Sequence, residues 1–152
     1  MNIVVIPDGA MIVIPLIEKN GHKYLSPTNF SKENNTDICE GKITFNNLSN
    51  KYVTGEAPSG VKARLFLFSG IIEKADACII INKTNKPHRK MYDSLNELIL
   101  FGTASCANAL SLELKIVYDL DIPKLYLEYP TNLDEIVQLI DKTNEFLKGL
   151  KC

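Results

Sequence analysis

Short runs of hydrophobic residues alternate along this chain with segments in which hydrophobic residues recur every three or four positions. The first pattern is typical of buried strands and the second of amphipathic helices. The runs predict three core strands, at Asn2–Ile6, Ala77–Ile81 and residues 124–129. Ala77–Ile81 is apolar at every position, as expected for a central strand of a parallel sheet that is covered on both faces.

Helical spacing predicts five helices. They cover residues 10–20, 61–75, 95–99, 104–119 and 133–147. In the last of them, Asn132 and Glu135 have the spacing of a capping box. The same pattern turns five hydrophobic residues toward the core, namely Leu133, Ile136, Val137, Ile140 and Leu147. For two segments, residues 63–68 and residues 98–101, a strand is the alternative to the predicted helix.

The remaining segments are more polar. Residues 22–26 predict a short second strand, and the asparagine-rich stretch 27–41 predicts an exposed loop. Residues 43–46 and 51–54 either form short strands or continue that loop. Strands that alternate with helices indicate a single α/β domain over residues 1–152, a Rossmann-like three-layer sandwich with a mostly parallel sheet. We expect residues 77–81 and 124–129 to lie side by side and to run in the same direction.

Composition narrows the classes of partner. The net charge of -1 gives no electrostatic reason to expect nucleic acid or an anionic membrane. No signal peptide and no apolar run of membrane-spanning length is recognised, so we expect a cytoplasmic protein. The 4 cysteines form no CxxC pair, which favours free thiols. Partners are therefore expected to be other proteins or a small anionic ligand.

Cys106 is the candidate metal ligand. It lies in a turn of small residues just before the predicted helix 104–119, and a helix N-terminus favours the thiolate form. A thiolate there could ligate a metal or an iron–sulfur cluster, with Cys39 as a second ligand. The alternative is that Cys106 is a small buried helix residue and Cys39 a loop thiol. Cys78 lies within an apolar strand and is expected in the core.

Other candidate ligand-binding residues follow the carboxyl ends of strands, where open α/β sheets bind ligands. Asp8 and Gly9 follow the first strand, but a single glycine does not make a dinucleotide cradle, and Asp8 could simply cap a helix. Four residues follow the central strand and could contact phosphate or carboxylate, unless they form a solvated basic loop: Asn82, Lys83, His88 and Arg89.

Two further candidates lie at the ends of predicted helices. The turn at residues 58–60 precedes a helix that carries Lys62 and Arg64 and could receive an anion. His22 follows an Asn-Gly helix stop and is expected to cap that helix. The chain has no HExxH, GxSxG or Walker loop, so hydrolase and kinase chemistry have no support. Whether the protein is an enzyme is left open by the sequence.

Two stretches resemble the archaeal family of methanogenesis marker protein 5. Residues 7–22, PDGAMIVIPLIEKNGH, are similar to its opening, with a proline turn, an aliphatic helix and a Glu-basic-x-Gly-His ending. Residues 60–64 and 70–76 resemble its middle segment. The resemblance implies an accessory protein of methanogenesis that supports the maturation of methyl-coenzyme M reductase.

The C-terminal part also resembles 2-hydroxyacyl-CoA dehydratase subunits, from Cys106 through the segment 121–128 to residues 145–147. In those subunits a cysteine at the corresponding helix start ligates a [4Fe–4S] cluster. This likeness implies that Cys106 is a cluster ligand. A small redox or iron–sulfur domain is therefore the alternative to the accessory role, although this chain is far shorter than those subunits.

Overall fold

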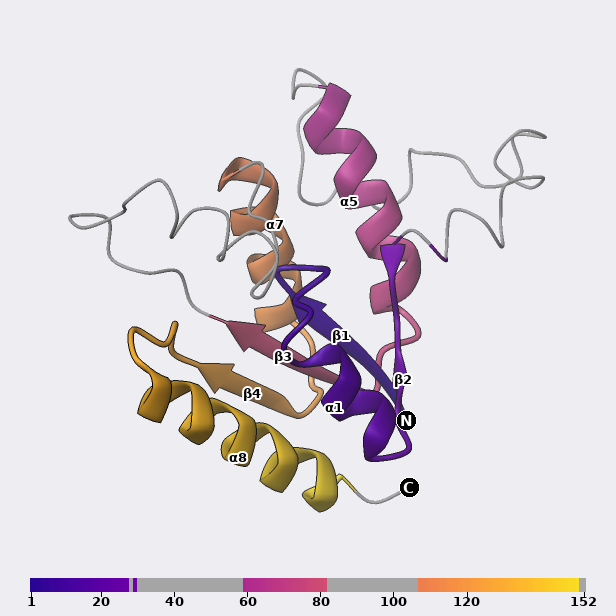
Figure 1. Cartoon of the computed structure of the whole chain (residues 1–152). Helices are drawn as coiled ribbons and strands as arrows, with labels where there is room; N and C mark the ends of the chain where they lie inside the picture. Colours follow the sequence, from indigo (N-terminus) through magenta and orange to yellow (C-terminus); the bar gives the residue numbers. More distant parts are fainter. Residues whose placement is uncertain (28, 30–58, 82–106, 151–152) are drawn as a thin grey trace.

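The computed structural model describes residues 1–27, 29, 59–81 and 107–150 (Figure 1). Over these ranges strands and helices alternate along the chain. The elements in order are β1 (Asn2–Ile6), α1 (Ile14–Lys19), β2 (Lys23–Tyr24), α5 (Ser59–Ile72), β3 (Ala77–Ile81), α7 (Ala107–Tyr118), β4 (Lys124–Leu127) and α8 (Leu133–Gly149). None of the described helices combines the length and the hydropathy that a membrane span requires.

The four strands form one parallel sheet in the order β2-β1-β3-β4. Ile6 lies opposite Ile80, and Ile81 lies opposite Leu127, so the carboxyl ends of these strands share one edge. The prediction that the strands at 77–81 and 124–129 are parallel neighbours is confirmed. After β2 the chain crosses to the other side of β1, which makes the gap between β1 and β3 a topological switch point.

Helices cover both faces of the sheet, as Figure 1 shows. Alternate side chains of β1 and β3 point to opposite faces. Val4 and Cys78 belong to the cluster that packs with α5 and α7, whereas Ile3 and Ile79 belong to the cluster that packs with α1 and α8. The expected Rossmann-like three-layer α/β sandwich is thereby confirmed. We call these two layers the α5/α7 face and the α1/α8 face.

Two polar side chains on the α1/α8 face bond backbone carbonyls, although His22 Nδ1 is buried without a hydrogen-bond partner among the described residues. The Thr143 hydroxyl, fully buried, donates to the Leu139 carbonyl at 2.7 Å. His22 Nε2 lies 3.0 Å from the Leu147 carbonyl in the last turn of α8. His22 therefore stabilises the end of α8. The prediction that His22 caps the preceding helix, α1, is confirmed through its backbone N–H, which donates to the Ile17 carbonyl at 3.1 Å.

The predicted capping box is present at the start of α8. The Asn132 side chain accepts the Glu135 N–H at 2.9 Å. In return, the Glu135 carboxylate accepts from the backbone N–H of Thr131 at 2.6 Å. These bonds satisfy donors that the first turn of a helix otherwise leaves unpaired.

Several predicted boundaries are wrong by a few residues. Helix α1 begins at Ile14 rather than at residue 10. Pro15 occupies its first turn, where a backbone N–H has no partner within the helix, so the missing N–H of proline costs nothing. β2 is only Lys23–Tyr24, and β4 ends at Leu127. The strand alternative for residues 63–68 is wrong because these residues lie within α5.

The predicted inward face of α8 is partly wrong. Leu147 is buried as expected, but Leu133 is 79% exposed and Val137 is 56% exposed. The buried positions are Leu139, Thr143 and Leu147, which recur every four residues. Leu133 and Val137 lie about 80° and about 120° around the helix from the centre of that stripe. Because Thr143 can bond its own helix backbone, a polar residue occupies the inner face and a hydrophobic one the outer.

The predictions for residues 30–41, 43–46, 51–54 and 95–101 lie outside the described residues. The same holds for residues 104–106, the predicted start of the helix that the structure describes as α7.

Candidate functional site

A cavity of ≈ 190 Å³ lies at the carboxyl end of β1, on the side of the sheet that carries α5 and α7. Helices α5 and α7 each precede a strand, so their N-terminal halves approach the edge at which the strands end. The cavity is lined by Val5, Asp8, Pro27, Arg64, Leu67, Phe68, Ile71 and Glu113. These residues come from β1, the turn after it, the segment after β2, and the two helices.

The turn after β1 holds Asp8 at the cavity. Gly9 has φ +76, a conformation that side chains disfavour, and its N–H donates to the Tyr24 hydroxyl at 3.0 Å. Burial chiefly raises the pKa of Tyr24, and the charge of Asp8 raises it further. The turn is thus fastened to β2, with the Gly9 N–H already engaged. Asp8 does not cap α1, because the N-cap of that helix is Val13.

Glu113 is the buried charged group of the site. It lies on α7 and is 8% exposed. Burial raises the pKa of its carboxyl from 4.5 to about 7; the negative charge of Asp8 adds to the rise, and the positive charge of Arg64 opposes it. At neutral pH Glu113 therefore exists in both protonation states. A carboxyl with such a shift in a cavity marks a candidate functional site.

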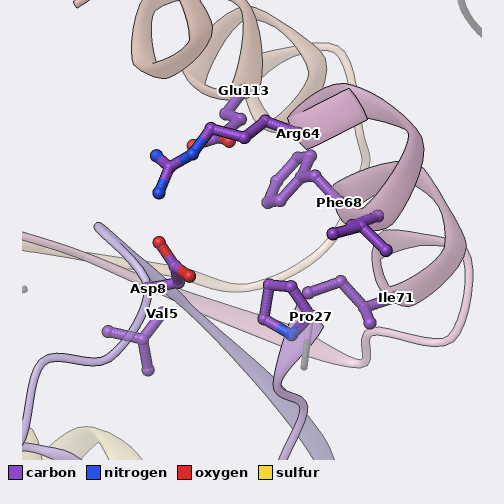
Figure 2. Close-up of a pocket in the computed structure, with 8 residues that line it drawn as sticks. Val5, Asp8, Pro27, Arg64, Phe68, Ile71 and Glu113 are labelled. Carbon is purple, nitrogen blue, oxygen red and sulfur yellow. The ribbon is translucent and has the colours of Figure 1, made fainter. Parts of the chain in front are cut away.

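Figure 2 shows the arrangement of these side chains. The Asp8 carboxylate and the Arg64 guanidinium point toward one another, and Glu113 lies behind Arg64. Phe68, Ile71 and Pro27 form an apolar wall on the other side of the space. One end of the cavity is therefore ionic and the other apolar, which is the usual composition of a small-molecule site.

The structure brings together two of the residues singled out from the sequence. Asp8 lines the cavity, and Arg64 faces it from α5. Gly9 lies in the same turn but is exposed, and Lys62 is half-buried on α5 and does not line the cavity. The other candidate residues lie outside the described residues: Cys39, Asn82, Lys83, His88, Arg89 and Cys106.

Cys78 is confirmed as a core residue. It is fully buried, and burial raises the pKa of its thiol to about 12. Such a thiol is inert at neutral pH. In the ranges that the structure describes, no three His, Cys, Asp or Glu side chains come together as metal ligands.

Glu113 was missed by the sequence interpretation, although a signal for it exists. Leu110 and Val117 are buried on α7, and Glu113 is three residues after the first and four before the second. These spacings put all three residues on one face of the helix. A carboxylate within the apolar face of a helix therefore indicates either a buried ion pair or a site.

The fold and the cavity define a class of protein, a doubly wound α/β domain with a small amphipathic cavity at the carboxyl end of β1. Comparison with known sequences gives the particular family. Residues 1–150 match a family described as "Uncharacterized protein conserved in archaea (DUF2112)". The chain belongs to this archaeal family.

A curated relative agrees with this assignment. It is "Uncharacterized protein MJ0404" of Methanocaldococcus jannaschii, which is 31% identical over 164 residues. The match covers 98% of this chain and 95% of the relative. No solved structure matches the sequence significantly.

Proposed function

We propose that this protein binds a small molecule in the cavity between the end of β1 and helices α5 and α7. The observation that supports the proposal is the buried Glu113 carboxyl, which shares the cavity with Asp8 and Arg64. A buried charged group costs stability unless it is well paired. A ligand that contacts all three groups would explain why the Glu113 carboxyl is buried at this position.

The size of the cavity limits the ligand. An enclosed space of about 150 Å³ accommodates benzene, and this cavity measures ≈ 190 Å³. Drug-sized ligands usually occupy about 300 Å³ or more. The ligand is therefore a molecule of one ring or its aliphatic equivalent, with a polar group toward Arg64 and an apolar body against Phe68 and Ile71.

Three one-ring probes of the same shape test the proposal. Benzoate, benzamide and benzamidine differ in charge but all fit this size, and NMR titration of the ¹⁵N-labelled protein reports where each one binds. At about 0.5 kcal/mol per non-hydrogen atom, the expected Kd is on the order of 1 mM. We expect the largest shifts at Asp8, Arg64, Leu67 and Glu113.

A blocked variant and a control make the result specific. Leu67→Trp fills the cavity without changing a charge and should abolish the shifts. Val137→Trp places the same side chain on the exposed face of α8, across the sheet from the cavity, and should leave them unchanged. The proposal fails if none of the three probes shifts cavity residues, or if Leu67→Trp binds them as the parent protein does.

The biological setting that we propose is methanogenesis, with the protein as a cytoplasmic accessory factor that supports methyl-coenzyme M reductase. Support comes from the resemblance of residues 7–22 and 60–76 to methanogenesis marker protein 5, and from membership of an archaeal family. Affinity purification of the tagged protein from its native cells tests this setting. Recovery of subunits or maturation factors of the reductase is the expected result, and their absence would contradict it.

A redox or iron–sulfur role through Cys106 is the alternative proposal. It rests on the likeness to dehydratase subunits and on the position of Cys106 before α7 in the sequence. Iron and acid-labile sulfide analysis after anaerobic purification tests it, with Cys106→Ala as the comparison. Equal, negligible iron in the two proteins would remove this alternative.

A further inference from the structure

The three charged groups of the cavity come from three separate elements. Asp8 lies in the turn after β1, Arg64 on α5 and Glu113 on α7. Among the described residues that line the cavity, Arg64 is the only cation. The charges that act on the Glu113 carboxyl from these elements are those of Asp8 and Arg64.

Most hydrogen-bond donors at the ionic end belong to one side chain, Arg64. The Arg64 guanidinium has five N–H donors in a planar fork, and a protonated Glu113 adds an O–H donor. The Asp8 carboxylate that points toward Arg64 can engage only part of this set (Figure 2). A ligand that brings acceptors can pair with guanidinium N–H groups beyond those that Asp8 engages. A carboxylate is the group whose two oxygens match a guanidinium fork.

A ligand carboxylate adds a third acidic group beside a single cation. Carboxylates that share one small cavity repel one another, which disfavours the state in which all three are ionised. Glu113 is the group that takes the proton, because it is 8% exposed whereas Asp8 is only half-buried. Its pKa is already about 7 without a ligand, chiefly because of burial.

We propose that the cavity binds a small carboxylate together with one proton, which Glu113 takes up from solvent and shares with the ligand. This inference rests on the proposed function. The step is balanced: the ionised ligand and the ionised Glu113 gain one proton from water between them, and the neutral Glu113 carboxyl then donates a hydrogen bond to the ligand carboxylate. No covalent bond forms or breaks.

The pH dependence of benzoate binding tests this inference. Benzoate stays ionised from about pH 5.5 to about pH 8.5, so a change in its affinity over that range reports on the protein. When Glu113 must be protonated in the complex, the affinity falls by up to about tenfold for each pH unit above the pKa of the free protein. Benzamide, which is neutral, should show little change. Calorimetry at about pH 8 in two buffers of different ionisation enthalpy should show uptake close to one proton per benzoate, because free Glu113 is mostly ionised at that pH.

The variant Glu113→Gln tests whether this carboxyl, and not another titrating group, causes the pH dependence of benzoate binding. The amide is always neutral and retains a donor, so benzoate should bind this variant with the same affinity at about pH 6 and about pH 8. Asp8→Asn is the companion variant; it removes a negative charge and should strengthen benzoate binding at every pH. Thermal unfolding and the NMR spectrum establish that each variant is folded.

The possible results are distinct from one another. An unchanged pH slope in Glu113→Gln, or proton release instead of uptake, overturns the proton-coupled mechanism. Tighter binding of benzamidine than of benzoate overturns the carboxylate assignment while leaving a small-molecule site in place. Binding of none of the three probes at any pH rejects the proposed function itself.

Discussion

The two faces of the sheet are built from the same strands but treat buried polar groups in different ways. On the α1/α8 face, the Thr143 hydroxyl and His22 Nε2 are held by carbonyls of α8. On the α5/α7 face, the Glu113 carboxyl adjoins a cavity and shares it with Asp8 and Arg64. The first face leaves one buried ring nitrogen, His22 Nδ1, without a hydrogen-bond partner among the described residues, whereas the second places a buried carboxyl beside a cavity large enough for a ligand.

This difference between the faces supports the proposed location of the binding site. The apolar pattern of the strands serves both faces equally, because alternate residues of β1 and β3 are buried on each. The faces differ in their helices. α8 turns the hydroxyl of Thr143 back to its own backbone, whereas α7 directs a titratable carboxyl into a space large enough for a ligand. Binding sites commonly give up stability in this way.

The largest predicted effect is a loss of folding stability, measured for one leucine on each face. Leu147→Ala on the α1/α8 face should lower the free energy of unfolding by about 2–5 kcal/mol, because Leu147 is 1% exposed and its removal leaves a new void. Leu67→Ala should lower it by less than about 2 kcal/mol, since Leu67 is half-buried beside an existing cavity. Urea denaturation at one pH measures both. Equal losses would contradict the distinction between the faces.

A second prediction concerns the pH dependence of stability. The folded pKa of Glu113, about 7, exceeds its unfolded value of 4.5, so the folded protein binds this proton more tightly. The stability that the proton provides is full below about pH 4.5 and is lost as the pH rises through about 7. Relative to Glu113→Gln, the parent protein should lose about 3 kcal/mol between these limits.

The measurement is a series of urea unfolding curves from about pH 4.5 to about pH 8 for the parent and Glu113→Gln. The exposed Glu145 on α8 supplies a matched control, Glu145→Gln. A pH-dependent difference of the same size in that control, or none in Glu113→Gln, would show that the buried carboxyl is not the source.

Much of the fold could be predicted from the sequence, because the strands have strong local signals. β1 and β3 have the predicted bounds, since each is a β-branched or wholly apolar run with a turn or a polar residue beside it. The exposed Leu133 and Val137 could not be predicted in this way. The burial of Thr143 depends on a hydrogen bond that hydrophobic periodicity does not register.

The candidate site could be predicted only in part. Asp8 follows a strand and Arg64 lies near a helix start, so general rules for α/β sheets indicate both positions. Glu113 is 49 residues beyond Arg64 in the chain, and only the packing of α7 beside α5 brings it to the cavity. Its shifted pKa is a property of that packing and of the charge of Asp8, neither of which a local pattern contains.

The smallest predicted effect tests whether the two faces act independently. Asn132→Ala removes the acceptor of the Glu135 N–H at the start of α8 and should cost about 1 kcal/mol of stability. The backbone N–H of Thr131 lowers the pKa of Glu135, so the contribution of this carboxylate is present above the unfolded pKa of 4.5 and is lost as the pH falls through the lower folded value. The Thr131 bonds remain in Asn132→Ala, so its stability difference from the parent should shrink only slightly in acid, through loss of the Asn132 amide bond to the Glu135 carboxylate. Because α8 lies across the sheet from the cavity, benzoate affinity at neutral pH should not change in this variant. A loss of affinity that accompanies the loss of stability would mean that the two faces are coupled, and the cavity would then depend on the α1/α8 face for its shape.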